Sequence, residues 1–260
     1  MIDSRAVIHE GAKIADNVEI GPYSIIGPEV DLASGCIIKS HVVISGKTTI
    51  GQNTKIFPFS SIGEEPIDRK YYGEDSQTII GKNNIIREGV TIHAGTHKQE
   101  GNRTVVGDNN LIMNYVHIGH DCRVGNNITL VNYSALAGHV QVDDYATIGV
   151  SCGVHQFSRI GKHVFVAHGT MVNQDVPPYL MVTGGTKATP CGINIEGLKR
   201  ANFSKEEITT IRLAYKIHYR QGNRLVAAIE KIKELALTQN SNILNDYVDI
   251  LENTQRGVIR

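Results

Sequence analysis

The sequence predicts a mainly β protein, in which short parallel strands wind into a solenoid, followed by a small α-helical domain. The solenoid is indicated by branched aliphatic residues that recur every six positions, and the helical domain by a capping motif near residue 204. Twenty-five hexads share the repeat, which is interrupted twice. A repeat this regular is typical of solenoid proteins. The repeat positions are Ile8, Ile14, Ile20, Ile26, Leu32, Ile38, Ile44, Ile50, Ile56, Ile62, Ile80, Ile86, Ile92, Val106, Ile112, Ile118, Val124, Leu130, Leu136, Val142, Ile148, Val154, Ile160, Val166 and Val172.

Each hexad predicts a short strand and a tight corner. The residue two positions before the aliphatic one is usually small or β-branched, so side chains alternate as a strand requires. Because the inward residues are apolar in hexad after hexad, the strands must wrap around a shared axis, and three hexads per coil form a triangular prism. Glycine often follows the aliphatic residue, and we expect these glycines at the turns, where a residue without Cβ is favoured. They are Gly21, Gly27, Gly51, Gly107, Gly119, Gly125, Gly149 and Gly161.

The organisation of the chain follows from where the repeat breaks and ends. We expect the β-helix over residues 1–190 and the helical domain over residues 191–260. Two loops, 64–79 and 97–103, leave the prism, and functional residues concentrate on such loops. The first loop carries a polar and aromatic set suited to a nucleotide or a sugar, although packing against a neighbouring subunit explains it equally well. Its members are Asp68, Lys70, Tyr71 and Tyr72.

The C-terminal segment has the pattern of a helical domain with a basic face. The segment Ser204–Glu207 predicts a capping box that opens a helix, and Gly222 ends this helix. Further helices are expected over residues 225–237 and 243–251. Residues 199–260 contain eleven Lys or Arg against seven acidic residues, a net charge of +4. This charge fits either a solvated cap or a surface for an acidic partner.

Composition excludes several classes of protein. With 41% apolar residues and no net charge, the chain has the balance of an ordinary soluble protein, without the character of a nucleic-acid-binding or transmembrane protein. No apolar signal region precedes the repeat, so we expect a cytoplasmic protein. Three of the four cysteines, Cys36, Cys122 and Cys152, occupy inward positions, which predicts small core residues and no disulfide framework.

The histidines are clustered. Eight of the eleven lie between His93 and His168. Since a coil of three hexads places equivalent positions one above another, several of them form a polar ladder along one edge of the prism. A stacked column at regular pitch is a candidate site. The ladder comprises His120, Gly138, His139, His155 and Gln156, with His117 on the first coil.

Two chemistries suit this column. In acyl transfer, His120 acts as the general base, since neutral imidazole has an ordinary pKa of about 6.5. Asp121 then orients the imidazole, and the backbone N–H of Gly138 stabilises an oxyanion. In zinc chemistry, three histidines bind the metal, and the spacing of His163 and His168 keeps a carbonic-anhydrase-like zinc protein as an alternative. His120 and His168 are not separated by a whole number of coils, so the column is not an obvious metal site.

Beyond the hexads, which resemble the hexapeptide-repeat transferases in general, seven segments resemble one family closely. Over its whole length the chain is similar to the UDP-N-acetylglucosamine acyltransferases, and the sixth segment together with the helical tail is the most selective feature. The resemblance implies a left-handed parallel β-helix and a homotrimer. The segments are His117–Cys122, Leu136–Val140, Val154–Phe157, Gln174–Tyr179, Ala188–Pro190, Asn194–Arg200 and Arg256–Arg260.

The resemblance also implies an activity and a set of site residues. The reaction is transfer of a 3-hydroxyacyl group from acyl carrier protein to the 3-hydroxyl of UDP-N-acetylglucosamine, the first step of lipid A biosynthesis, with no metal and no cofactor. The basic tail then has a partner, because acyl carrier protein is strongly acidic. The implied catalytic residues are His120, Asp121 and Gly138. The implied substrate-binding residues are Asp68, Lys70, His93, His117, His139, His155, Gln156, Asn194, Glu196 and Arg200.

Two positions depart from the family pattern. Ala201 stands where many family members have a second arginine. His168 occupies the position that sets acyl chain length, so we expect it to truncate the acyl groove that a glycine would leave deep. Three alternatives stay open: an amine acceptor in a modified sugar, the zinc protein, and a purely structural solenoid. The last needs neither the histidine column nor the loops.

Overall fold

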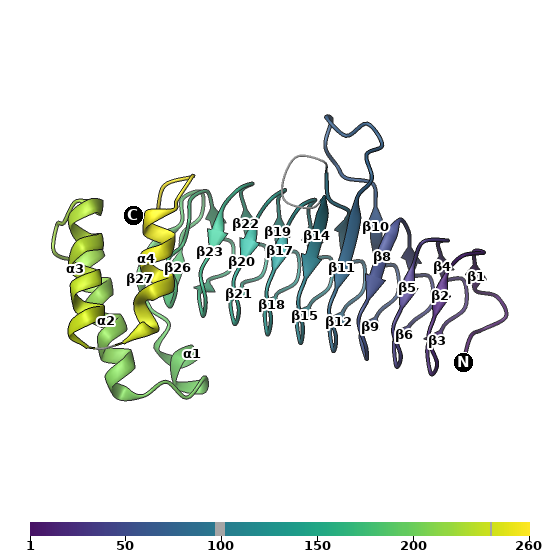
Figure 1. Ribbon diagram of the computed structural model, residues 1–260, viewed down its shortest axis with the longest axis horizontal. Helices are drawn as coiled ribbons and strands as arrows, with labels where there is room; N and C mark the ends of the chain where they lie inside the picture. The colour runs from purple at the N-terminus through teal and green to yellow at the C-terminus, as the bar shows by residue number, and fades with distance from the viewer. Residues whose placement is uncertain (97–101, 240) are drawn as a thin grey trace.

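The computed structural model describes residues 1–96, 102–239 and 241–260. It shows an elongated prism with helices gathered at its C-terminal end (Figure 1). Three sheets form the faces, and strands of successive coils pair in parallel. From β1 to β25 the hydrogen-bonded order skips two strands each time, as expected when the chain visits each face once per coil, and β26 and β27 then extend the third sheet.

Every one of the twenty-five repeat residues lies in a strand, so the predicted hexads are confirmed. One sheet contains β1 (Val7–Ile8), β4 (Ile25–Ile26), β7 (Val43–Ile44), β10 (Ser61–Glu64), β13 (Thr91–His93), β16 (His117–Ile118), β19 (Ala135–Leu136), β22 (Gly153–Val154) and β25 (Met171–Val172). The second contains β2 (Lys13–Ile14), β5 (Asp31–Leu32), β8 (Lys47–Ile50), β11 (Gln77–Ile80), β14 (Arg103–Val106), β17 (Arg123–Val124), β20 (Gln141–Val142) and β23 (Arg159–Ile160). The third contains β3 (Glu19–Ile20), β6 (Ile37–Ile38), β9 (Lys55–Ile56), β12 (Ile85–Ile86), β15 (Leu111–Ile112), β18 (Thr129–Leu130), β21 (Thr147–Ile148), β24 (Phe165–Val166), β26 (Leu180–Thr183) and β27 (Thr189–Ile193).

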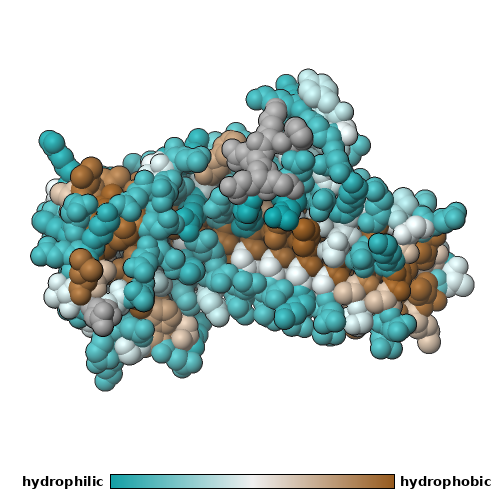
Figure 2. All heavy atoms as spheres, viewed as in Figure 1, coloured by the Kyte–Doolittle hydropathy of each residue, from teal (hydrophilic) through white to brown (hydrophobic). Residues whose placement is uncertain are grey.

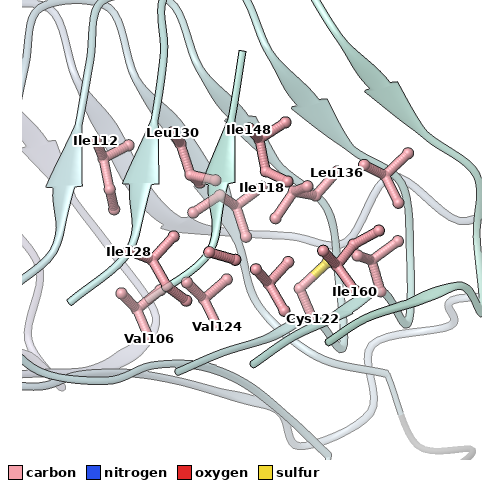
Figure 3. Packing of buried hydrophobic residues seen from close by; sticks show 14 of the residues in the cluster. Val106, Ile112, Ile118, Cys122, Val124, Ile128, Leu130, Leu136, Ile148 and Ile160 are labelled. Atoms are coloured by element: carbon pink, nitrogen blue, oxygen red, sulfur yellow. The ribbon is translucent and has the colours of Figure 1, made fainter. Parts of the chain in front are cut away.

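The repeat residues form the core along the prism axis. From Ile20 to Val172 each is at most 3% exposed, whereas Ile8 and Ile14 in the first coil are half-buried. Figure 3 shows residues from all three faces, such as Ile112 and Leu136, converging on the interior. Full burial of one such side chain stabilises the fold by about 1.5–3 kcal/mol. Cys36, Cys122 and Cys152 are buried free thiols, as predicted.

The corners differ from the prediction that was based on glycine. Gly21, Gly51 and Gly149 do not have positive φ, and what excludes a side chain there is the next coil, since a Cβ would lie 2.5 to 2.8 Å from its backbone. The left-handed backbone occurs two residues later, where Asn83 has φ 58° and His139 has φ 61°. Asn, Asp and His tolerate this conformation better than most residues. Close stacking of the coils therefore explains these glycines.

The C-terminal part is helical, as predicted. It comprises α1 (Ile195–Arg200), α2 (Lys205–Tyr219), α3 (Leu225–Thr238), the short 3₁₀ helix η1 (Asn242–Leu244) and α4 (Asn245–Glu252). The capping box at Ser204 and Glu207 is present. Ile208 and Ile211 are buried and Ile217 is half-buried. The hexads did not predict α1, whose N-cap is Asn194.

Three boundaries need correction. The first loop is shorter than the predicted 64–79, because Glu64 still belongs to β10 and β11 already begins at Gln77. β27 crosses the predicted domain boundary at 190/191, since it pairs antiparallel with β26 and continues the sheet to Ile193. Of the second predicted loop, 97–103, residues 97–101 lie outside the described residues, and Arg103 already belongs to β14. Within the part that is described, no helix has the length and apolar character needed to cross a membrane.

Candidate active site at one corner of the prism

The corner that follows the β16, β19 and β22 strands carries the predicted ladder. Asp121, His139 and Phe157 occupy the same corner position on three consecutive coils, with φ values of 59°, 61° and 65°. His120 and Gly138 each come one residue earlier. The rings of His139 and Phe157 stack with their centroids 4.5 Å apart. The eighteen-residue coil thus brings His120, Gly138 and His139 together.

His120 and Asp121 form a buried pair at this corner. The two residues are 9% and 8% exposed, and the imidazole Nδ1 lies 2.8 Å from the carboxylate Oδ2. Burial acts against ionisation of Asp121, but hydrogen bonds from His120 and Thr96 outweigh it and hold the pKa of the carboxyl below its usual range. With Nδ1 engaged by a carboxylate, Nε2 is the nitrogen of His120 that is available to a substrate.

Gly138 lies directly against this Nε2. A Cβ on Gly138 would lie 2.4 Å from Nε2, so no other residue fits without displacing the imidazole. Among the described residues, the backbone N–H of Gly138 donates to no protein backbone carbonyl. Proline, which has no N–H, occupies the same position of an earlier coil at Pro28, and the equivalent hexad position at another corner at Pro22 and Pro58. The N–H at this corner position is therefore not needed by the fold and is free at Gly138.

Further histidines extend the site toward the first loop. The rings of His93 and His117 are 5.5 Å apart, and those of His120 and His139 are 5.1 Å apart. His117 Nδ1 is 2.9 Å from Thr91 Oγ1. Burial lowers the pKa of both His117 and His139, which favours neutral rings near pH 7.

The first loop lies between β10 and β11 on the same edge (Figure 1). Asp68 is half-buried and Lys70 is exposed, and the Lys70 backbone N–H donates to Asp68 Oδ1 over 3.0 Å. The negative charge of Asp68 reaches His139, where it opposes the effect of burial on the pKa of that ring. The first loop thus places a carboxylate near the histidine corner.

A second group of predicted residues forms a separate groove. Asn194 caps α1 by accepting the N–H of Gly197 and also donates to the His163 carbonyl over 2.9 Å. Together with Glu196 and Arg200 it lines a groove of about 590 Å³ over the outer face of β18, β21, β24 and β26. Ala201 lines the same groove.

The two groups lie on different edges of the prism. In Figure 1 the first loop rises from the upper edge, whereas α1 lies below the lower edge. His155 and Gln156 are exposed on the coil after His139, and His168 is exposed at another corner, after β24. One chain therefore does not unite all of the predicted site residues.

Comparisons with known proteins identify the family. A model of the bacterial transferase hexapeptide, with six repeats, matches residues 11–46 and 103–138, and a model described as Udp N-acetylglucosamine O-acyltransferase, domain 2, matches residues 175–259. The acyl-[acyl-carrier-protein]–UDP-N-acetylglucosamine O-acyltransferase of Stutzerimonas stutzeri is 45% identical over 260 residues, which cover 100% of this chain and 99% of the relative. The chain belongs to the UDP-N-acetylglucosamine O-acyltransferase family.

Solved structures of this acyltransferase family agree with the chain over its full length. The UDP-N-acetylglucosamine acyltransferase of Francisella novicida is 52% identical, with a TM-score of 0.96, and the match covers 100% of this chain and 94% of that one. The Acinetobacter baumannii LpxA structure is 41% identical, with a TM-score of 0.96, covering 100% and 99%. The predicted family, the predicted class of O-acyltransferase and the left-handed parallel β-helix with its helical C-terminal part are confirmed.

The zinc alternative has weak geometric support in this family member. The possible ligand atoms of His120, Asp121 and His139 lie within 4.8 Å of one another, close enough to surround a cation. Both oxygens of Asp121, however, already accept hydrogen bonds from Thr96 and His120. His163 and His168 join no such cluster among the described residues, and the His163 ring stacks on Tyr145 instead.

Sequence analysis missed two threonines of the acyltransferase corner. Thr96 donates to Asp121, and Thr104 Oγ1 accepts the Asp121 backbone N–H over 2.8 Å. Thr104 occupies an inward hexad position, where small and β-branched residues are common, so nothing in the pattern distinguished it. Thr96 lies outside the repeat, and only the pairing of neighbouring coils brings it to Asp121.

Proposed function

We propose that this chain transfers a 3-hydroxyacyl group from acyl carrier protein to the 3-hydroxyl of UDP-N-acetylglucosamine, the first step of lipid A biosynthesis. The observation that carries the proposal is the buried His120–Asp121 pair, whose free Nε2 faces the backbone of Gly138. The matched relative from Stutzerimonas stutzeri carries this activity in its name. No metal or cofactor enters the proposed reaction.

The proposed reaction begins with proton transfer. His120 Nε2 takes the proton of the sugar hydroxyl as its oxygen attacks the thioester carbonyl carbon, and the C–O bond forms. The imidazolium that results is stabilised by Asp121, whose lowered pKa keeps the carboxylate charged. When the tetrahedral intermediate collapses, the C–S bond breaks and the leaving thiolate receives the proton from His120.

The oxyanion of that intermediate needs a donor. The N–H of Gly138 is free of backbone partners within the described residues and lies next to Nε2 of His120, so it is positioned to bind the carbonyl oxygen. A single donor of this kind typically contributes about 10²–10³ to the rate. In the proposal, the path of the substrates to His120 is lined by His139, His117 and His93. Asp68 and Lys70 on the first loop bind the sugar.

The α1 groove suits the nucleotide end of the acceptor. Asn194, Glu196 and Arg200 supply amide, carboxylate and guanidinium groups for a uracil and a diphosphate. Glu196 is already paired with Lys199 over 2.9 Å, which lowers its pKa and keeps it charged. Ala201 contributes no charge, so the diphosphate relies on Arg200 alone at this end of the groove.

We infer a homotrimer because the two groups of site residues lie on different edges of one chain. A neighbouring chain that packs side by side would bring its α1 groove toward this histidine corner. Figure 2 shows an apolar band along the prism, bordered by hydrophilic residues. On the β3-containing sheet, the outward side chains of Ile85, Phe165 and Met181 are 40%, 38% and 37% exposed. Such apolar surface on a soluble rod favours association. In such a trimer, His155 and Gln156 complete the site, either in the chain that carries His120 or from the neighbouring chain.

Acyl carrier protein has a candidate docking surface on α2. Lys205, Arg212 and Lys216 are separated by seven and four residues, so they share one exposed face of α2, and the exposed C-cap residue Arg220 follows four residues later. No ion pair of Lys205, Arg212 or Lys216 occurs in the described part of the chain. This basic stripe complements an acidic carrier protein, whose docking takes place in the cytoplasm in our proposal.

His168 is the proposed acyl-chain ruler. It is exposed at its corner, and in our proposal its ring shortens the acyl groove that glycine would leave open. His168→Gly should shift the preferred acyl group toward longer chains, with about 10-fold discrimination for each methylene of mismatch. An unchanged preference would contradict the ruler.

The decisive experiment incubates the protein with UDP-N-acetylglucosamine and 3-hydroxyacyl carrier proteins of graded chain length. We expect O-acylated product with one preferred length, detected by mass spectrometry. If product forms only with an amino-sugar acceptor, the acceptor group is an amine and not a hydroxyl. Stoichiometric zinc in purified protein, with no acyl transfer, would favour the carbonic-anhydrase-like zinc protein. Light scattering of the same sample tests the trimer.

A further inference from the structure

The carboxylate of Asp121 has two histidine neighbours and one threonine clamp. Its Oδ2 lies 2.8 Å from His120 Nδ1 and 3.6 Å from His139 Nε2. Thr96 donates twice, from its backbone N–H to Oδ1 and from Oγ1 to Oδ2, each over 2.8 Å. Because these bonds engage both oxygens, they fix the rotation of the carboxylate about its Cβ–Cγ bond.

Thr96 is itself held firmly. It is 3% exposed, and the residues before it are bound to both ends of the first loop. Ala94 N–H donates to the Glu64 carbonyl over 2.9 Å, and Gly95 N–H donates to the Gln77 carbonyl over 3.3 Å. A Cβ on Gly95 would lie 2.3 Å from the backbone nitrogen of Arg103, so this segment packs tightly against the start of β14.

We propose that Thr96 is a positioning residue that aims Asp121 at Nδ1 of His120 and away from His139. The inference rests on the proposed acyl transfer for its kinetic part, but its geometric part concerns only the His120–Asp121 pair. Without the Thr96 hydroxyl, Oδ2 loses one of its donors and turns toward His139. The His120 tautomer that carries its proton on Nδ1 and leaves Nε2 unprotonated is then less populated.

The test compares Thr96→Val with Thr96→Ser. Valine keeps the shape and the backbone donor but removes the hydroxyl, and a hydrogen bond to a charged group contributes enough that we expect kcat to fall about 10-fold or more. The KM for UDP-N-acetylglucosamine should stay within about twofold, since Thr96 is 3% exposed and its hydroxyl already donates to Asp121. Thr96→Ser should restore kcat to within about threefold. Thr78→Val is the matched control, because Thr78 is equally buried and its hydroxyl has no hydrogen-bond partner among the described residues.

A double variant separates positioning from packing. If Thr96 acts through the carboxylate, Thr96→Val should cost about 10-fold in the wild type and less than about twofold on top of Asp121→Asn. An equal loss in both backgrounds would show a packing role and overturn the proposal. Unchanged kcat in Thr96→Val would overturn it as well.

Histidine ring ¹⁵N shifts give a readout that needs no turnover. In the wild type we expect His120 to carry its proton on Nδ1, and in Thr96→Val we expect a mixture of tautomers together with a changed His139 signal. Identical His120 signals in both proteins would overturn the proposal. Wild-type protein that shows the expected tautomer but transfers no acyl group would instead count against the proposed function. Should Thr96→Val not fold, Thr96→Ala and Thr96→Ser provide the same comparison.

Discussion

Two corners of the prism share one backbone geometry and differ in chemistry. At the corner after the β2-containing sheet, asparagines stack in a ladder, with Asn53, Asn83 and Asn109 joined by side-chain hydrogen bonds of 3.4 and 3.1 Å. At the corner after the β1-containing sheet, Asp121 and His139 occupy the same left-handed position. The asparagine side chains of the ladder hydrogen-bond to one another. At the histidine corner, Nε2 of His120 and the N–H of Gly138 are available to a ligand. The fold supplies the positions, and the side chains decide which corner is a site.

The largest contrast between the corners should come from His120→Ala. Loss of a general base typically costs about 10²–10⁴ in rate, and we expect about 10³-fold lower kcat in acyl transfer. Circular dichroism and thermal unfolding should stay close to wild type, because the side chain lies at a corner and not in the core. More than a tenth of wild-type turnover in this variant would rule out His120 as the base.

Gly138→Ala should have the next largest effect. Its Cβ would lie 2.4 Å from His120 Nε2, so the imidazole must move and the oxyanion donor shifts with the backbone. We expect kcat to fall about 10²–10³-fold. Gly185→Ala is the control, since a Cβ there meets nothing within 4 Å and φ is not positive. Equal kcat in both variants would show that the site tolerates a displaced imidazole.

A buried histidine that has no carboxylate partner should make the free energy of unfolding depend on pH. His218 lies 3.3 Å from Tyr247 Oη, and burial, reinforced by the charge of Arg260, lowers its pKa to about 4. The unfolded chain, with an ordinary pKa of about 6.5, then binds a proton that the native state does not, so stability falls as pH decreases from about 6.5 to about 4. The loss is at most about 3 kcal/mol. Urea unfolding at pH 7 and 4.5 should show a smaller difference in His218→Phe, and an identical difference would assign the pH dependence to other groups.

The asparagine corner should show only a small effect on stability and none on turnover. Asn83→Ala removes the ladder hydrogen bonds and places alanine at φ 58°, which costs about 1–2 kcal/mol in the left-handed region. Asn83→Gly removes the same amide without that backbone cost and should be less destabilised. Denaturant unfolding measures both, and kcat should match wild type. A loss of turnover in Asn83→Gly would mean that this corner also belongs to the site.

The success of sequence analysis differed between the repeat and the residues outside it. His120, Gly138 and His139 were predicted to meet because one coil has a constant length, so their spacing in sequence translates into contact. The groove at α1 was found only through family motifs such as Asn194–Arg200, since no periodicity connects α1 with the coils. Thr96 and Thr104 were not predicted, because their contact with Asp121 depends on how the interrupted coils pair.

The sequence by itself determined the prism, its hexads and the row that contains His120 and Gly138, because a repeat of fixed length places each residue by its position in the period. Only the tertiary structure decided which hydrogen bonds are made within that row. It showed that stacking of the coils, and not turn geometry, excludes side chains at Gly21 and Gly51. It also showed Asp121 between two histidines and clamped by Thr96, and the α1 groove on another edge. These features depend on distances of a few ångströms between coils, to which a pattern along the chain is insensitive.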